Sequence, residues 1–595
     1  MSFLKKVTGY KGLISCVVRF TALLLVVCLL MPLVSPVTAS ASIPTRRTLR
    51  IGLNYNTTAL PSANLQNDVG SGFEFGYYDA NLNFTRVATT TETRITMMID
   101  HNMVWNPGGA FSGAYYSVVT AAPPSGSTTV GYLHWQINSG RSTLAQAQAD
   151  IAGIPGGFIR YNANSGDGVY IPMYGNYTSS ANANAAKRSS AHTSNSGTGN
   201  TITVARTGTN VVLFEFDNTG NTSKLFGVRP LGGSGLSTHF RGYRYYGGFR
   251  YERRVNSAMT VVNIVNLEDY VKGVIPYEMS PSWPLEALKA QALCARTYAI
   301  SMLNKHSSHG FDLCTEMDCQ VYRGRGSAST TSDNAVNQTA GLFITYNGNL
   351  CETYYASSHG GGSENNENIW VGTARPYLRG VLDSYEEDIN ISGYSWTRTI
   401  SQSTVTANVR KTYPSASTIV SMWVSQYTPT GNVLSVTVKD SNGKDYTFSR
   451  RGGLQSLLGV DAVRSQRFNI GSVTWKPGGS IYANVPAQQI TTSQYNVISA
   501  TEGGAVSTTT VSGSLTAIDG TGASGTMKTV IGGGAGTQSG SPTSPVGGNF
   551  TITGRGWGHS IGMSQWGAYS QAQVHKRTAE QIIKHYFTGV QITKG

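Results

Sequence analysis

A long stripe of apolar residues at helical spacing lies near the middle of the chain. Steps of three and four residues place all of its members on one side of a helix. Pro284 precedes the stripe, at a first-turn position where its missing N–H would have no partner anyway. The pattern predicts a helix from Pro284 to about Asn304, whose alanines allow close packing against a neighbour. The stripe consists of Leu285, Leu288, Ala292, Ala295, Ala299 and Met302.

Most of the remaining chain has the pattern of short strands. From Thr48 to about Trp105, alternating apolar runs are separated by turn residues. A strand from Met259 to Val265 precedes the predicted helix, and further strands are expected from Asp388 to about Phe468. The predicted fold class is therefore α+β, in which a mostly β scaffold carries one central helix and small accessory β and αβ modules.

The length of 595 residues favours two to four domains. The segment from about Thr501 to Asn549 is dominated by Gly, Ser and Thr, a composition that buries little apolar surface. Changes in composition give the predicted organisation: an N-terminal leader (1–41), an N-terminal β region (42–130), a paired αβ region (131–188), a linker (189–201), a first core part (202–387), an insertion (388–549) and a second core part (550–595).

The leader has a basic start, an apolar run from Phe20 to Val34, and small residues after it. This order is typical of a signal peptide, and the run is short for a membrane span, which needs about 20 apolar residues. Retention as an N-terminal anchor is the alternative. In either case we expect the rest of the chain to be exported, outside the cell or on the outer face of its wall or membrane, and to touch a membrane only through an uncleaved anchor.

Charge and composition indicate the kind of partner. The net charge is +14, which attracts anionic partners. Only 13% of residues are charged, while Ser, Thr, Asn and Tyr are abundant, as suits work on carbohydrate. An ordinary secreted β-rich protein has a similar composition. The sequence has no Lys/Arg run interleaved with aromatic residues, which is the pattern of nucleic-acid-binding proteins. An anionic cell wall is therefore the expected partner.

Two similar units occupy residues 131–188. Each has a strand-like run followed by an Ala-rich stretch: Tyr132–Ile137 with Thr143–Ala152, and Gly168–Tyr174 with Ser179–Ala186. This pattern resembles the SPOR-type repeat, a module that binds peptidoglycan stripped of its peptides. A plain αβ packing unit is the alternative.

Glu278 lies between the predicted strand and the predicted helix, in a segment that we expect to be a loop. A carboxyl group near a helix N-terminus and a packed core can have its pKa shifted in either direction. Capping of the following helix is the structural alternative.

The residues around Glu278 and several later blocks resemble the SpoIID/LytB family and occur in that family's order. The resemblance covers about Gly242 to Val590, with the insertion unmatched. Its blocks are Leu267-Glu268-Asp269-Tyr270, Pro276-Tyr277-Glu278-Met279, Glu286 to Ala292 with Ala295-Arg296-Thr297-Tyr298, Tyr354-Tyr355-Ala356-Ser357-Ser358-His359-Gly360-Gly361, Trp370, and Gly554 to Ala568.

The SpoIID branch of this family consists of lytic transglycosylases that act on peptide-free glycan during sporulation. The LytB branch is described as enhancers of a cell-wall amidase. The resemblance implies a MurNAc–GlcNAc lyase that forms 1,6-anhydro ends, with glycan strands and other cell-wall or sporulation proteins as partners, or a non-enzymatic enhancer of an N-acetylmuramoyl-L-alanine amidase. A lytic enzyme needs only one carboxyl, because the C6 hydroxyl of the sugar is the nucleophile.

By the same resemblance Glu278 is the catalytic acid beside a glycan-binding groove. Candidate groove residues are Arg296, Tyr298, Tyr355, Ser357, His559 and Gln565. Each of them has a structural alternative.

Arg296 could instead pair with Glu268, Asp269 or Glu278. The residues from Tyr355 to His359 could simply shape a glycine-rich turn after the hairpin that Asn347-Gly348 predicts. A His359–serine hydrolase pair lacks an evident acidic member.

Four cysteines follow the leader: Cys294, Cys314, Cys319 and Cys351. His309, Cys314 and Cys319 form a compact group of zinc-type ligands, with His306 close by. Some members of the family carry a His/Cys/Cys zinc site at this place, which implies a structural metal that catalysis does not require. A Cys314–Cys319 disulfide is the alternative, and a fourth ligand is not evident.

Overall fold

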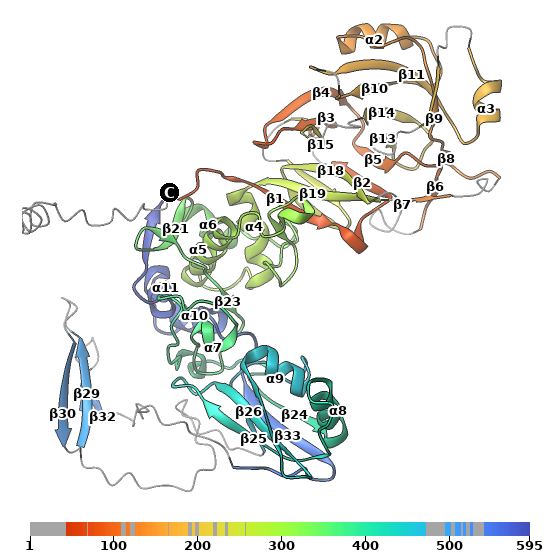
Figure 1. Cartoon of the computed structure of the whole chain (residues 1–595). Coiled ribbons are helices and arrows are strands. Elements are labelled where there is room, and N and C mark those ends of the chain that lie inside the picture. The colour runs from red at the N-terminus through yellow and green to blue at the C-terminus, as the bar shows by residue number, and fades with distance from the viewer. Residues whose placement is uncertain are drawn as a thin grey trace, which may run out of the picture.

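The computed structural model describes residues 43–67, 70–108, 115–119, 125–164, 166–188, 193–196, 201–217, 223–232, 236–255, 258–471, 494–500, 506–512, 516–518, 524–526 and 541–595. They form an α+β fold, as predicted, with helices in the middle of the molecule and strands on either side of them (Figure 1). The predicted leader, most of the predicted linker and much of the Gly/Ser/Thr-rich segment lie outside these residues. Within them, no helix is long and apolar enough to cross a membrane.

A seven-stranded sheet joins the N-terminal strands to the strand that leads into the helices. Strands β1 and β19 pair antiparallel, with Leu49 opposite Val265. The predicted strand at Met259–Val265 is confirmed, and its continuous apolar run is buried, as expected of a core strand. The strand order is β20 (Leu313–Cys314), β1 (Thr48–Asn54), β19 (Ala258–Asn266), β18 (Gly248–Val255), β15 (Leu225–Pro230), β3 (Phe73–Tyr78) and β4 (Phe84–Thr90).

A ten-stranded sheet packs against the seven-stranded sheet in one shared core. Phe214 stacks on Phe75 of the other sheet, with ring centroids 5.1 Å apart. Strands from the predicted regions 42–130 and 202–387 therefore share one core. The order is β12 (Thr193–Ser196), β9 (Leu133–Gln136), β11 (Val169–Tyr177), β10 (Gly157–Asn162), β14 (Val212–Asp217), β13 (Thr201–Arg206), β5 (Arg94–Ile99), β2 (Ser62–Asn67), β16 (Ser237–Phe240) and β17 (Tyr243–Tyr246).

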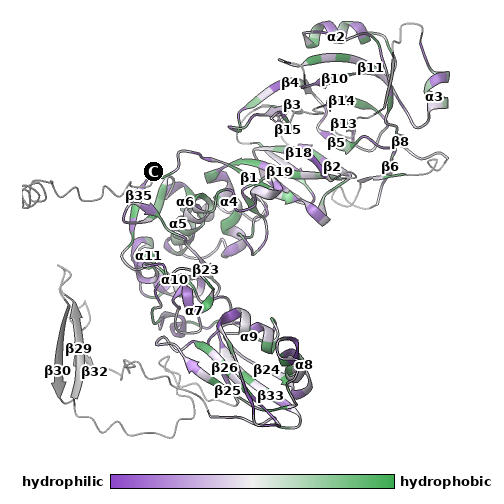
Figure 2. Ribbon diagram, viewed as in Figure 1, coloured by the Kyte–Doolittle hydropathy of each residue, from purple (hydrophilic) through white to green (hydrophobic). Residues whose placement is uncertain are grey.

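The two predicted strand-plus-helix units are confirmed as local structure. Strand β9 leads into α2 (Leu144–Ile151), and β11 leads into α3 (Ser180–Ala185). Side chains of Thr143 and Ser179 cap these helices. Together the units form a βαββαβ module with the antiparallel order β12-β9-β11-β10. Figure 2 shows hydrophilic and hydrophobic stretches interleaved along its strands. Binding of stripped glycan by this module stays a prediction.

Helix α5 (Leu285–Ser301) is the predicted central helix, and it ends three residues earlier than expected. Every residue from Ala287 to Ile300 except Lys289 is buried. The helix is thus enclosed on several sides, rather than packed along one stripe, and its small alanines permit this close approach. Its neighbours are α4 (Leu267–Glu278), α6 (Thr330–Gln338), α10 (Gln565–Gln573), α11 (Ala579–Tyr586) and β21 (Leu342–Tyr346).

The insertion has a hydrophobic core of its own. Strand β24 pairs antiparallel with β33, so the chain leaves and re-enters the insertion side by side. Phe550 and Ile552 of β33 belong to this core, so the insertion extends beyond its predicted end at Asn549. Its elements are β24 (Ser395–Ser401), α8 (Gln402–Thr412), β25 (Ile419–Tyr427), β26 (Val433–Asp440), β27 (Asp445–Ser449), α9 (Arg450–Leu458), β28 (Phe468–Ile470) and β33 (Asn549–Arg555).

Short elements complete the described chain. Strand β21 forms the predicted hairpin with β22, and Asn347 and Gly348 at its tip both have positive φ, as a tight hairpin turn requires. The remaining elements are β6 (Met103–Asn106), β7 (Tyr115–Val118), β8 (Thr129–Val130), β22 (Asn349–Leu350), β23 (Tyr355–Ala356), α7 (Asn366–Ile369), β29 (Gln494–Ala500), β30 (Val506–Ser512), β31 (Thr516–Ile518), β32 (Ser524–Thr526), β34 (Met563–Ser564) and β35 (Gln591–Lys594).

Candidate active site

Glu278 is the last residue of helix α4, so the prediction that it lies in a loop was wrong. The Asn266 side chain caps the start of this helix by accepting from the backbone of Glu268 at 2.9 Å. Gly273 and Pro276 are helix breakers by propensity. However, a side chain at position 273 would collide with the ring of Tyr322, so close packing requires glycine there.

Glu278 is partly exposed as a residue, and its carboxyl group receives hydrogen bonds from two segments that are distant in sequence. The backbone N–H of Val321 donates to Oε1 at 2.7 Å, and Nε2 of Gln565 lies 3.4 Å from Oε2. The Tyr355 hydroxyl lies near this carboxyl group but donates its proton to Oε1 of Gln320 at 2.9 Å. Burial raises the pKa of Glu278, and the contacts with Val321, Gln565 and Tyr355 lower it without cancelling the rise. Within the described residues, no second carboxyl group shifts this pKa.

Three aromatic side chains that we did not predict form a cluster, and its members are near Glu278 and Gln565 in the sequence. The ring of Trp283 lies 4.6 Å from that of Trp566 and 5.0 Å from that of Tyr569. All three side chains are partly exposed. Partly exposed aromatic rings provide apolar faces for a sugar. Trp566 stands next to Gln565 in the sequence, and that adjacency could have indicated it.

The glycine-rich loop before α10 is packed against the segment from Tyr355 to Gly360. An added side chain at Gly556 or Gly558 would come within about 2.5 Å of that segment, so the glycines serve close packing.

His559, on this loop, donates to the backbone of Tyr355, and its ring lies 5.0 Å from that of Trp370. Burial and the nearby charge of Arg451 lower the pKa of His559 to about 4, so it is neutral near pH 7.

The structure brings together Glu278, Tyr355, Gln565 and His559 among the predicted residues. Ser357 is partly exposed and adjoins them, because its carbonyl accepts from the Trp566 N–H at 3.0 Å.

Arg296 and Tyr298 do not belong to this group. The Arg296 side chain is fully buried and pairs with Glu268 at 2.7 Å, so its prediction as a sugar ligand was wrong and the pairing alternative holds. Tyr298 is only 4% exposed, and its hydroxyl donates to the Asp318 carbonyl at 3.4 Å, which removes it from any sugar contact.

His359 is not part of a hydrolase pair. Its ring is buried, and burial lowers its pKa to about 3. The acidic residue nearest to this segment is Glu386, which accepts from the Ser358 hydroxyl at 2.8 Å and from the backbone N–H of His359 at 2.7 Å. Glu386 therefore fixes the backbone of the glycine-rich turn rather than orienting the imidazole.

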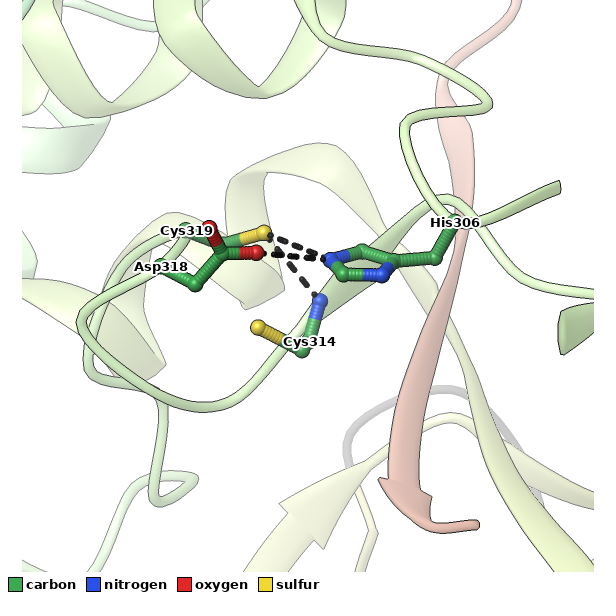
Figure 3. Close-up of side chains that lie close together, drawn as sticks. All are labelled: His306, Cys314, Asp318 and Cys319. Atoms are coloured by element: carbon green, nitrogen blue, oxygen red, sulfur yellow. Dashed lines mark hydrogen bonds and ion pairs between the residues drawn. The ribbon is translucent and has the colours of Figure 1, made fainter. Parts of the chain in front are cut away.

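Four side chains of the types that bind metal ions lie close together, and all of them precede Val321 in the sequence (Figure 3). The ligand atoms of His306, Cys314, Asp318 and Cys319 all lie within 4.8 Å of one another. His306 Nε2 is 3.3 Å from the Cys319 sulfur and 3.2 Å from an Asp318 oxygen. Zinc bonds of about 2.0–2.3 Å place tetrahedral ligands at about such separations, so these residues fit zinc.

This cluster corrects the predicted ligand set. His309 instead packs its ring 5.4 Å from Tyr55, and His306 takes its place. Asp318 is a candidate for the fourth ligand, which the sequence pattern did not identify. Both Cys314 and Cys319 are free thiols, so the disulfide alternative is not formed.

Comparisons with known proteins agree with these motifs. Residues 255–346 match the family described as SpoIID, stage II sporulation protein. The chain is 29% identical to an uncharacterised protein of Brachyspira hyodysenteriae over 352 residues, which are 59% of this chain and 73% of that protein.

Two relatives from Bacillus subtilis have descriptive names. The amidase enhancer is 30% identical over 328 residues, 54% of this chain and 40% of the enhancer, so the chain matches less than half of that relative. Stage II sporulation protein D is 24% identical over 348 residues, 56% of this chain and 76% of that protein. The matched region begins within β18 and contains the whole of α4 and α5. The resemblance to the SpoIID/LytB family that the sequence motifs indicated is therefore confirmed over the part of the chain that these matches cover.

Proposed function

We propose that this protein is an exported peptidoglycan lytic transglycosylase in which Glu278 is first the acid and then the base. The observation that carries this proposal is the environment of the carboxyl group. Glu278 is partly exposed as a residue, burial raises the pKa of its carboxyl group, and Val321 and Gln565 donate hydrogen bonds to that group. Similarity to stage II sporulation protein D supports a role in the cell wall, in the setting of sporulation.

The reaction follows from that environment. Protonated Glu278 gives its proton to the oxygen of the MurNAc–GlcNAc bond, and the bond from that oxygen to C1 breaks. The C6 hydroxyl of the same MurNAc attacks C1, and the Glu278 carboxylate takes the hydroxyl proton. The product has a 1,6-anhydro end, and the carboxyl group returns to its starting form. The donors around Glu278 stabilise the intermediate anion, and the raised pKa keeps the proton available.

The test is digestion of purified peptide-free glycan, with products identified by mass spectrometry. Wild type is expected to release anhydro-ended fragments. Glu278→Gln keeps the shape and removes the proton donor, so it is expected to slow the reaction at least about 100-fold. Glu580→Gln is the matched control, because Glu580 is exposed and, among the described residues, pairs with Lys584 on the same helix. Equal rates for Glu278→Gln and wild type would reject the proposal.

The second candidate function is a wall-binding enhancer of an amidase. Two observations favour it: the similarity to the amidase enhancer, and the absence of a carboxyl group among the hydrogen-bond partners of Glu278 in the described residues. It predicts glycan binding without anhydro products, stimulation of an added N-acetylmuramoyl-L-alanine amidase, and no effect of Glu278→Gln on either.

We further propose that His306, Cys314, Asp318 and Cys319 bind a structural zinc ion. The metal would tie together the segment whose Val321 N–H donates to Glu278, two residues after Cys319. Metal analysis of the purified protein is expected to find one zinc per chain, and Cys319→Ser to lose it and to lower the melting temperature. His309→Ala should retain the metal. Protein with free thiols and no zinc would reject this site.

A further inference from the structure

Trp557 is 57% exposed although the chain beneath it is tightly held. Its backbone N–H donates to Ser358 at 2.9 Å and its carbonyl accepts from Ser358 at 3.0 Å. The flanking Gly556 and Gly558 are packed against that same segment. The indole is thus presented to solvent from a fixed backbone, which limits the entropy lost when a ligand packs on it.

Two arginines from the insertion border this indole. The guanidinium carbon of Arg464 lies 4.4 Å from the centre of the Trp557 ring. Arg451, on α9, donates to the carbonyl of Gly558 at 3.1 Å. In the described part of the chain, neither guanidinium pairs with a carboxylate. The insertion therefore adds positive charge beside the exposed ring, which favours an anionic ligand.

Trp557 and the candidate active site border the same short segment of the chain. The Tyr355 side chain lies near the Glu278 carboxyl group, and the Tyr355 backbone accepts from the ring of His559. Ser358, three residues after Tyr355, exchanges backbone hydrogen bonds with Trp557. The segment from Tyr355 to Ser358 therefore joins the surroundings of Glu278 to Trp557.

We propose that Trp557 and Arg464 form a second saccharide subsite, which binds a muramoyl sugar of the strand that Glu278 cleaves. The apolar C–H face of the sugar stacks on the free face of the indole, and the sugar's lactyl carboxylate pairs with Arg464. This inference rests on the proposed glycan substrate, and it gives the insertion a role in substrate affinity.

The experiment measures binding by calorimetry on the full chain with Glu278→Gln, which prevents turnover. Two probes are used: peptide-free glycan fragments, which carry carboxylates, and chitin oligosaccharides of equal length, which do not. Trp557→Ala is expected to weaken binding of both probes by at least about fivefold, as removal of a central tryptophan does, and Trp557→Phe to retain most of it. Arg464→Gln is expected to weaken only the anionic probe, by about two- to fivefold, and to reduce the salt dependence of its binding.

Matched controls separate this effect from general damage. Tyr115 is 50% exposed in β7, far from Glu278 in the sequence, and Arg398 in the insertion hydrogen-bonds to the carbonyl of its neighbour Thr397. Tyr115→Ala and Arg398→Gln should leave both affinities unchanged, and melting temperatures confirm folding.

Three results would overturn the subsite: parent affinity in Trp557→Ala, equal losses for both probes in Arg464→Gln, or no binding of either probe by the parent. Loss of binding in Trp557→Ala without any cleavage by wild type would instead keep the subsite and reject the transglycosylase. Cleavage that requires Glu278, with unchanged binding in Trp557→Ala, would keep the transglycosylase and reject the subsite.

Discussion

Removal of the Glu268 carboxylate tests how α4, and with it Glu278, is fixed to the central helix. Nε of Arg296 lies 2.9 and 3.1 Å from the two carboxylate oxygens, and Nη2 lies 2.7 Å from one of them. Glu268 also accepts from the backbone N–H of Gly341 at 3.1 Å. One carboxylate thus joins α4, α5 and the segment before β21.

Glu268→Ala leaves a fully buried cation without its anion. Breaking a buried ion pair in this way costs about 3–5 kcal/mol. Two features place the cost near the lower end. The Glu268 side chain is 26% exposed, so water reaches the pair, and Arg296 keeps longer contacts with the Val336 carbonyl at 3.2 Å and the Thr339 hydroxyl at 3.3 Å. We expect a loss of about 3 kcal/mol in the free energy of unfolding.

The assay is urea unfolding, monitored by tryptophan fluorescence. Trp283 and Trp566 serve as the reporters near α4. Asp269→Ala on the same helix is the control. Asp269 is 37% exposed and lies 3.9 Å from Lys272, so its loss should change stability by no more than about 0.5 kcal/mol. A double replacement, Glu268→Met with Arg296→Met, should cost less than Glu268→Ala because no charge is left buried. A loss below about 1 kcal/mol in Glu268→Ala would refute the reasoning, since that is the size of an exposed pair.

Three further predictions follow from other contacts. Gln565→Leu removes a hydrogen bond that lowers the pKa of Glu278, so the alkaline limb of the pH–rate profile should move to higher pH; a shift to lower pH would contradict this. Gly558→Ala should cost more than about 2 kcal/mol in thermal unfolding, because position 558 has a φ of 131° and its new Cβ would lie 2.5 Å from the Cβ of Ala356. Gly393→Ala, where the new Cβ would meet open space, should cost about 1 kcal/mol. Burial alone would raise the pKa of Glu215, but the charges of Arg160 and His134 hold it well below its usual range. The stabilisation by the Glu215 carboxylate is therefore present above the ordinary glutamate pKa and is lost as the pH falls. Glu215→Gln should cost about 3–5 kcal/mol at pH 7 and flatten the acid side of the stability curve.

Local signals predicted local structure. The apolar stripe gave α5, the Val/Ile run gave β19, and Asn347-Gly348 gave the hairpin, because each signal acts within a few residues of the element that it specifies. Helix α4 was missed for a physical reason. Its Gly273 and Pro276 disfavour helix by propensity, and packing against Tyr322 overrides that preference.

The errors within the site arise from contacts between distant residues. Arg296 is charged and so was expected to be available to a ligand, but its partner Glu268 is 28 positions away on another helix. Spacing could not choose between His306 and His309. In the fold, His306 faces Cys319 while His309 packs on Tyr55, which comes from the N-terminal region. Asp318 was not recognised because an acidic residue in a polar loop gives no distinctive signal.

The environment of Glu278 shows why one carboxyl group can serve both halves of the proposed reaction. A buried carboxyl group without donors would hold its proton strongly and would form the anion only at high cost. A carboxylate with two donors in open solvent would have lost its proton well below neutral pH. At Glu278 the two influences oppose each other, and burial is the larger. Because Val321, Gln565 and Tyr355 come from separate segments, this balance exists only in the folded chain. A group that must give up a proton and then recover it within one reaction needs such a balance, since excess in either direction would slow one of the two steps.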